Sequence, residues 1–165
     1  MAILDGWRYC PRCAAGIVAA AGHVECPACG FVAWGNSVPA VQALLAREGR
    51  LLLGRRGIEP GLGKWDLPGG FLEEGEHPLD GLRRELLEET GLEIEPGDFV
   101  GVWLEPYDGR VVFGLTYRAT ATGEGRAGDD LTELRWFAPD ELPGPGELAF
   151  SAQPEILSRW RHEHT

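Results

Sequence analysis

The sequence predicts an α/β fold, a sandwich in which a mixed sheet surrounds one central helix and a second helix closes the chain. Three observations support this prediction: apolar runs of strand length alternate with breaker-rich loops, one strongly periodic helix lies near the middle, and no internal repeat occurs. The 165 residues suit one medium domain with a small appendage. We therefore expect an appendage at residues 1–35 and a main domain at residues 36–165.

Six segments of the main domain have the composition and length of β-strands. Hairpin turns are expected at residues 47–50 and at Asp108-Gly109, and a soft acidic loop is expected at residues 122–130. The predicted strands cover residues 38–45, 51–53, 65–67, 99–104, 111–119 and 133–137.

The central helix is predicted at residues 78–90. Pro78 stands near its start, where a missing N–H does no harm, and Gly91 stands just past its end as a C-terminal cap. Leucines recur along it at helical spacing and should face the core. The terminal helix is expected at residues 152–162.

All four cysteines fall in the first 30 residues, as two Cys-x-x-Cys pairs with twelve residues between them. The pairs are Cys10 with Cys13 and Cys26 with Cys29. Zinc prefers four tetrahedral thiolates, and each Cys-x-x-Cys turn presents two of them. The spacing predicts a zinc ribbon, in preference to two disulfides, which a reducing cytoplasm disfavours, or to an iron site of the rubredoxin type.

We expect this zinc to be structural. Four thiolates leave no coordination position open for water, whereas a catalytic zinc keeps one. A segment of about 25 residues buries little core, so metal binding should supply its folding free energy. Nucleic-acid contact or dimer docking by the ribbon is the alternative role.

The predicted central helix carries three carboxylates on one face. Glu85, Glu88 and Glu89 stand at positions i, i+3 and i+4, so they project from one side of a helix, one turn apart. Three like charges weaken an isolated helix, but a cluster of hard oxygen ligands is what Mg²⁺ or Mn²⁺ requires. A solvated acidic face is the alternative interpretation.

Residues 70–92 fit the pattern G-x5-E-x7-R-E-U-x-E-E-x-G-U, where U is aliphatic, at every specified position. A chance match is on the order of 10⁻⁸ per starting point at average residue frequencies. This pattern is the Nudix box, and the chain resembles the Nudix hydrolases over residues 36–160. The resemblance implies a Nudix α/β/α sandwich with a mixed sheet, and hydrolysis of a nucleoside diphosphate linked to another group.

The resemblance also implies the roles of the box residues. Glu85, Glu88 and Glu89 would bind the catalytic metals, Mg²⁺ or Mn²⁺, and the backbone carbonyl of Gly70 would add a ligand. Arg84 would hold Glu85 and Glu76 in place through charge-assisted hydrogen bonds. Glu76 is expected to orient other groups rather than to bind metal.

The family takes its general base either from the box helix or from a carboxylate in a later loop. The loop position lies six residues before the tryptophan of a Trp-Phe segment, and here it is Asp130. Asp is one methylene shorter than the usual Glu, so we favour Glu85 or Glu89 as the base. Two neighbouring carboxylates are rivals to Asp130: Asp129 and Glu133.

Substrate contacts are predicted outside the box as well. Arg55 and Arg56 end a strand that approaches it, and one of them is expected to hold a substrate phosphate. The alternative is an exposed charge on an edge strand. Tyr107 and Phe150 could stack on an adenine or flavin ring, although packing is the favoured interpretation.

A ribbon fused to a Nudix domain resembles two subgroups. The NADH pyrophosphatases, which include NAD-cap decapping enzymes, carry a Ser-Gln-Pro-Trp-Pro-Phe-Pro motif after the box, and residues 94–107 contain nothing like it. The plant FAD and ADP-ribose pyrophosphatases share the short ribbon and a Leu-Ala-Phe-Ser run, here residues 148–151. ADP-ribose or FAD is therefore the expected substrate. A nucleotide sensor that does not cleave its ligand is a further alternative.

Composition narrows the partners and the location. The net charge of −11 argues against broad capture of nucleic acid or of an anionic membrane surface. We find no apolar run long enough to span a membrane and no signal peptide, so we expect a cytoplasmic protein. The partner is expected to be a small dinucleotide or nucleotide sugar, and the resemblance makes a homodimer the default.

Overall fold

The computed structural model describes residues 4–164, which divide into two compact units. One unit contains the described residues up to Val38 together with Pro106–Val111, and the other contains the rest of the described chain. None of the described helices has the length and apolarity that crossing a lipid bilayer requires.

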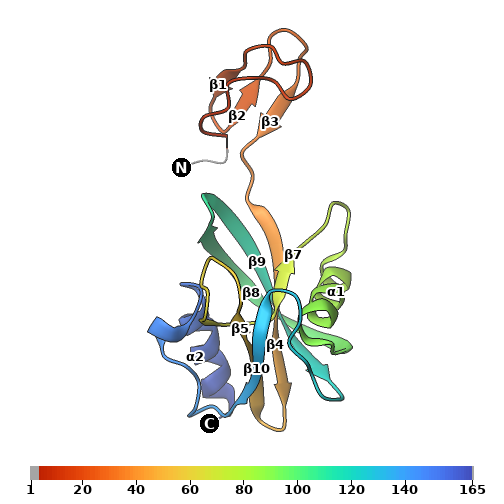
Figure 1. Cartoon of the computed structure of the whole chain (residues 1–165), viewed down its shortest axis with the longest axis vertical. Helices are drawn as coiled ribbons and strands as arrows, with labels where there is room; N and C mark the ends of the chain where they lie inside the picture. Colours follow the sequence, from red (N-terminus) through yellow and green to blue (C-terminus); the bar gives the residue numbers. More distant parts are fainter. Residues whose placement is uncertain (1–3, 165) are drawn as a thin grey trace. The chain divides into compact units, whose positions relative to one another are not determined.

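The first unit is built on a three-stranded antiparallel sheet, drawn in red to orange in Figure 1. Its strands are β1 (Val18–Ala20), β2 (His23–Glu25) and β3 (Val32–Trp34), in that spatial order. The residues described up to position 35 have only three buried side chains: Cys10, Val24 and Cys26. A core of this size cannot stabilise a fold by itself.

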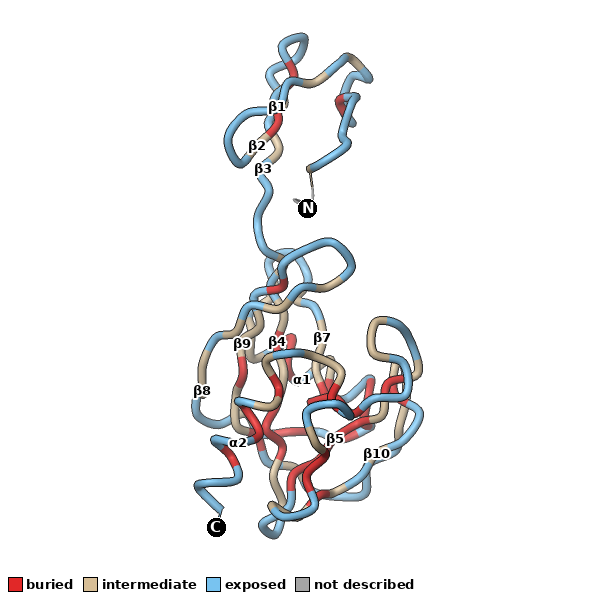
Figure 2. The backbone as a smooth tube through the Cα atoms, turned by 90° about the vertical axis from the view of Figure 1, so that its left-hand side faces the viewer, coloured by how far each residue is buried: buried red, intermediate tan, exposed pale blue. Residues whose placement is uncertain are grey.

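The second unit is organised around a seven-stranded sheet with the order β10-β5-β4-β9-β8, in which β6 pairs with β5 and β7 pairs with β4. Figure 1 labels the five strands of this order and β7. The strands are β4 (Val38–Arg47), β5 (Arg50–Arg56), β6 (Trp65–Asp66), β7 (Gly69–Phe71), β8 (Ile94–Tyr107), β9 (Arg110–Ala121) and β10 (Leu131–Phe137). Figure 2 shows that buried residues concentrate on the strands of this sheet.

One helix covers each face of the sheet, α1 (Pro78–Thr90) on one side and α2 (Gln153–His164) on the other (Figure 1). A single-turn helix, η1 (Pro145–Glu147), precedes α2. Alternate residues of β5 serve the two layers, because Leu52 packs in the cluster with α1 whereas Leu51 and Leu53 pack in the cluster with α2. The predicted α/β/α sandwich with a mixed sheet is confirmed.

The predicted elements are observed with shifted ends. The central helix matches its prediction, and α2 begins and ends slightly later than predicted. The prediction of residues 99–104 was too short, because β8 runs from Ile94 to Tyr107 and includes Pro96. β8 is an edge strand, where a proline without an N–H costs no internal hydrogen bond of the sheet.

Candidate functional site

Local sequence signals hold the carboxylate helix α1 in place. The Nδ1 atom of His77 accepts a hydrogen bond from the Leu79 N–H at 3.3 Å, which caps the N-terminus. Gly91 adopts a left-handed conformation with φ 66°, and its N–H donates to the carbonyl of Leu87 at 2.9 Å. The two caps therefore fix the ends of the helix on which Glu85, Glu88 and Glu89 lie.

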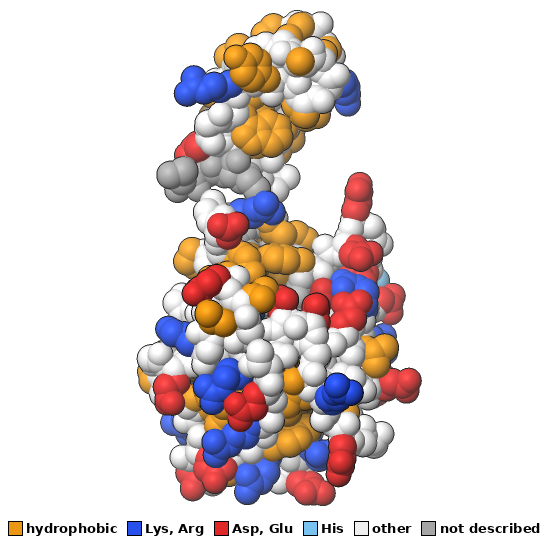
Figure 3. Space-filling view, viewed as in Figure 1, with side chains coloured by type: hydrophobic (Ala, Val, Ile, Leu, Met, Phe, Trp, Pro, Cys, Tyr) orange, Lys and Arg blue, Asp and Glu red, His pale blue; other side chains and the backbone are white. Residues whose placement is uncertain are grey.

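Arg84 is the centre of a hydrogen-bonded group of carboxylates. Its Nε and Nη2 atoms donate to the two oxygens of Glu76, each at 2.9 Å, and these hydrogen bonds lower the pKa of Glu76 to about 2. Its Nη1 atom donates to Glu85 at 2.7 Å and to Glu88 at 3.2 Å. Figure 3 shows acidic side chains gathered around a basic one on the side where Figure 1 draws α1. Arg84 thus contacts both residues that it was predicted to hold.

Glu89 is the buried member of the acidic face, with 4% of its surface exposed. Burial raises its pKa to about 9, although the Gly69 N–H donates to it at 2.8 Å, and the negative charges of Asp66, Glu85 and Asp130 act in the same direction as burial. Burial also raises the pKa of Glu85, against the effect of Arg84. A cation at this face would relieve both effects.

Gly70 lies directly against the acidic face. A Cβ atom at this position would come within 2.3 Å of Glu85 Oε2, so any side chain would displace that carboxylate. The β7 strand that carries Gly70 pairs with β4 through Val41. The sheet therefore brings the Gly70 backbone to the carboxylate with which it was predicted to share a metal.

The loop at residues 122–130 packs on the C-terminal end of α1. The Gly128 N–H donates to the carbonyl of Glu89 at 2.9 Å, which satisfies a helix-end acceptor. Asp129 and Asp130 follow, and their negative charges act on Glu85 and Glu89 respectively. Two of the three predicted loop carboxylates thus lie near the acidic face.

The third loop carboxylate, Glu133, forms an ion pair away from the acidic face. Its carboxylate accepts a hydrogen bond from Arg55 Nε at 2.8 Å, and the Arg55 guanidinium lies 4.3 Å from the ring centroid of Trp65. Trp65 belongs to the cluster that packs with α2. Arg55 and Glu133 therefore interact on the side of the sheet away from α1.

Arg56 is buried, with only 6% of its surface exposed. Its Nη1 atom pairs with Asp66 Oδ2 at 2.8 Å, and its Nε atom donates to the carbonyl of Pro60 at 2.7 Å. Its guanidinium lies 5.1 Å from the ring centroid of Phe150. The alternative of an exposed edge-strand charge is wrong for Arg56, because β5 lies between β10 and β4.

Sequence reasoning missed Asp66 and Gln153. Asp66 is 7% exposed and accepts hydrogen bonds from both Arg56 and Gln153 Nε2. Burial raises its pKa, against the effects of Arg56 and Gln153. The signal for Asp66 was a lone carboxylate between Trp65 and Leu67, since a charge inside an apolar strand requires a partner. Nothing in the sequence singled out Gln153.

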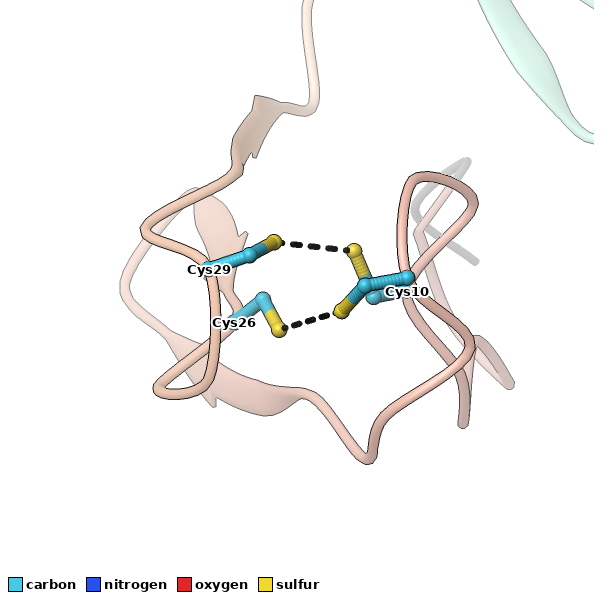
Figure 4. Close-up of side chains that lie close together, drawn as sticks. Cys10, Cys26 and Cys29 are labelled. Carbon is cyan, nitrogen blue, oxygen red and sulfur yellow. Dashed lines mark hydrogen bonds between the residues drawn. The ribbon is translucent and has the colours of Figure 1, made fainter.

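The four cysteine sulfurs face one another across the ribbon, as Figure 4 shows for Cys10, Cys26 and Cys29. The Sγ atoms of Cys10 and Cys29 are 3.7 Å apart, and those of Cys13 and Cys26 are 3.6 Å apart. A tetrahedral zinc with Zn–S bonds of about 2.3 Å places its sulfurs about 3.8 Å apart. The cysteines are free thiols rather than disulfides, and their arrangement fits a zinc ribbon.

Histidine, cysteine, aspartate and glutamate side chains can all bind a metal. Within residues 4–164, the four cysteines are the one group of three or more of them whose ligand atoms lie within 4.8 Å of one another. The three carboxylates of α1 do not converge that closely, because Arg84 holds Glu85 and Glu88 whereas the Gly69 N–H holds Glu89. The two candidate metal sites thus differ in how far their ligands are already assembled.

The NUDIX domain family model matches residues 36–159. An ADP-ribose pyrophosphatase from Methanocaldococcus jannaschii is 34% identical over 128 residues, which cover 74% of each chain. A NAD-capped RNA hydrolase NudC from Stutzerimonas stutzeri is 30% identical over 140 residues, 82% of this chain but 50% of that protein. A crystal structure of a NUDIX hydrolase from Nitrosomonas europaea superposes with a TM-score of 0.84 at 27% identity, covering 95% of this chain and 92% of that one. The chain therefore belongs to the Nudix family and is a Nudix hydrolase.

Proposed function

We propose that the protein is a divalent-metal-dependent diphosphohydrolase that cleaves an ADP-containing compound, ADP-ribose or FAD in the first place, and releases AMP. The observation that carries the proposal is the acidic face of α1, where Glu85, Glu88 and Glu89 lie beside Arg84 and next to the Gly70 backbone. The name of the Methanocaldococcus jannaschii relative supports ADP-ribose as the first compound to test.

Glu85, Glu88, Glu89 and the carbonyl of Gly70 would hold the cation. The donor set fits Mg²⁺ or Mn²⁺, because every donor is a hard oxygen, and the burial of Glu89 favours a bound cation over a bare carboxylate. When bound, the cation neutralises phosphate oxygens and lowers the pKa of a bound water. Arg84 keeps Glu85 and Glu88 extended along the helix face.

The proton of the attacking water goes to a carboxylate of this site. Glu85 and Glu89 remain the favoured bases, since both carboxylates lie against the Gly69-Gly70 backbone at the centre of the proposed cation site, within reach of a water held there. Asp130 is the candidate from the loop, because its charge acts on Glu89. Glu133 is the weakest candidate, since Arg55 holds it.

We further propose that the four cysteines bind zinc with a structural role: Cys10, Cys13, Cys26 and Cys29. The sulfur spacing supports this proposal, and a four-thiolate site leaves no position for water. Zinc content and native mass of one preparation would test the zinc and the expected homodimer together. A cytoplasmic location remains a prediction.

NAD-capped RNA or NADH is the second candidate substrate. The NudC relatives favour it, because their similarity covers more than four fifths of this chain. The absence of the Ser-Gln-Pro-Trp-Pro-Phe-Pro motif from the segment after the box weighs against it. This chain also spans only about half of those relatives.

The test is Mg²⁺-dependent turnover of a panel: ADP-ribose, FAD, NADH, a nucleoside triphosphate and an NAD-capped RNA. We expect AMP release from ADP-ribose or FAD, and loss of that activity in Glu88→Gln and Glu89→Gln. Glu93→Gln is the matched control, because Glu93 is an exposed glutamate just beyond the same helix. Binding of a panel member without turnover by the wild type would identify a nucleotide sensor instead.

A further inference from the structure

A buried polar network adjoins the acidic face, and two of its members, Asp66 and Gln153, have no role in the proposed function. Asp66 is its centre, with Arg56 on one side and Gln153 on the other. All three side chains are buried, at 7%, 6% and 1% exposure respectively. Burying a charge pair costs desolvation, so a network of this kind requires an explanation beyond stability.

Arg56 and Asp66 lie on the α1 side of the sheet, and Gln153 contacts Asp66 from the first position of α2. Leu52 faces α1, so the alternation along β5 places Gly54 and Arg56 on the same side. Asp66 is the cross-strand partner of Gly54 and therefore shares that side. The negative charge of Asp66 acts on Glu89, which places the network beside the carboxylates.

Arg56 is fixed from several directions. Asp66 and the carbonyl of Pro60 hold its guanidinium, and the ring of Phe150 lies alongside. Gln153 holds Asp66 in turn, while its Oε1 atom accepts a hydrogen bond from the Phe150 N–H at 3.4 Å. Two nearby residues, Pro60 and Asp66, and one distant segment, residues 150–153, thus fix one cation.

A diphosphate substrate needs such a cation. It carries at least two negative charges into a region that already contains Glu85, Glu89 and Asp130. Arg84 is committed to the carboxylates that it braces. An arginine that is already immobile loses no rotamer freedom when it takes a phosphate, and its planar fork matches phosphate oxygens.

We propose that Asp66 and Gln153 are positioning residues that fix Arg56 as the phosphate-binding cation at the edge of the carboxylate site. The proposal rests on the proposed function, because it assigns the substrate phosphate to Arg56. It explains why the Leu-Ala-Phe-Ser run lies here: the Ala149 N–H donates to the carbonyl of Trp65 at 2.9 Å, which aligns Phe150 with Arg56.

The experiment compares KM and kcat of Asp66→Asn and Gln153→Met with those of the wild type. We expect KM to rise about tenfold in Asp66→Asn and about threefold in Gln153→Met, with kcat nearly unchanged, because Arg56 contacts substrate and transition state alike. In an Arg56→Gln background, Asp66→Asn should raise KM no further, since a positioning residue acts only through its partner.

The matched control is Glu141→Gln, which removes an exposed ion pair with Arg50 at the other end of the same strand and should leave KM unchanged. Melting temperatures are recorded for every variant. A lower melting temperature at unchanged KM would overturn the proposal in favour of a structural network. A KM change of Asp66→Asn that persists without Arg56 would also overturn it.

The dissociation constant of ADP-ribose, measured with Ca²⁺ in place of Mg²⁺, separates this proposal from the proposed function. If the wild type turns over ADP-ribose and the variants keep its KM, the positioning role of Asp66 and Gln153 is excluded and the proposed function stands. Binding without turnover by the wild type would remove the proposed function, and weaker binding in Asp66→Asn would still support the role of Asp66.

Discussion

The two candidate metal sites of this chain are built on opposite principles. In the ribbon, four thiolates face one another at tetrahedral spacing, and the buried core consists of two of those cysteines and one valine. On α1, Arg84 holds two carboxylates and the Gly69 N–H holds the third, in a unit whose two large apolar clusters need no metal. The comparison teaches that a metal at the first site would make the fold, whereas a metal at the second would enter a fold that already exists.

Zinc removal should have the largest effect and should be confined to the ribbon. Binding to a structural site of this kind contributes roughly 10–16 kcal/mol to folding, far more than one buried valine. We expect a zinc chelator, with Mg²⁺ present, to unfold the ribbon and leave the second unit folded. Indole NMR signals report both parts, because Trp7 and Trp34 lie in the ribbon and Trp160 lies in a core. Unchanged Trp34 signals after complete zinc loss would contradict the comparison.

The second largest effect is expected from Arg84, which holds the glutamates of the second site. Arg84→Lys keeps the positive charge but loses the planar fork that contacts Glu76, Glu85 and Glu88. We expect kcat to fall by about 10- to 100-fold, the usual loss when a partner of metal ligands is removed. Arg83→Lys is the matched control, because Arg83 lies on the same helix and forms exposed ion pairs with Asp80 and Glu95. Equal kcat values for the two variants would exclude a bracing role.

Metal binding on α1 should depend on pH. The pKa of Glu89 is about 9 in the metal-free fold and 4.5 in an ordinary glutamate, so the folded state keeps a proton that the unfolded state has lost. Stability without metal therefore falls as pH rises between these values. Mg²⁺ must displace this proton, so the gain in melting temperature at fixed Mg²⁺ should grow with pH. Glu89→Gln cannot titrate, so its gain in melting temperature should not depend on pH. A wild-type gain that is equal at all pH values would refute the coupling between Mg²⁺ and the Glu89 proton.

The smallest effect, on zinc affinity, is expected from a difference between the two Cys-x-x-Cys turns of the ribbon. The residue after each cysteine pair is left-handed, Ala14 with φ 60° and Gly30 with φ 70°, and each donates its N–H to the first cysteine of its pair. Only Ala14 has a Cβ atom that opposes this conformation, by about 1 kcal/mol. Ala14→Gly should therefore raise zinc affinity about fivefold in a competition with a chelator. No change would mean that the ribbon tolerates the strain.

Local patterns were enough to predict several features. The ends of α1 follow from Pro78 and Gly91, and the cysteine pairs predict the cluster that is observed, because these signals act within one turn or one knuckle. The acidic face was predictable for the same reason, since helical spacing alone aligns Glu85, Glu88 and Glu89. The Nudix box added the family, which the comparisons confirm.

Other features depended on distant partners. The full length of β8 was missed, because a proline in its sequence reads as a breaker unless the strand is known to be an edge. Glu105 on β8 accepts hydrogen bonds from the N–H groups of Ser151 and Ala152 at 2.9 and 2.8 Å, so it holds the residues just before α2 across 46 or more positions. No sequence pattern in either segment predicts that the two are in contact.

The sequence by itself determined the candidate metal-binding residues, the helix that presents three of them and the family, because each depends on spacing along a short stretch of chain. Only the tertiary structure decided which arginine of β5 approaches the carboxylates and what holds it there. Arg55 and Arg56 are adjacent in the sequence, but the alternation along β5 and the helix that covers each face turn one towards the α2 side and the other towards the α1 side. The contact of Asp66 with Gln153 joins residues 87 positions apart, and only packing of the sheet against both helices brings them together.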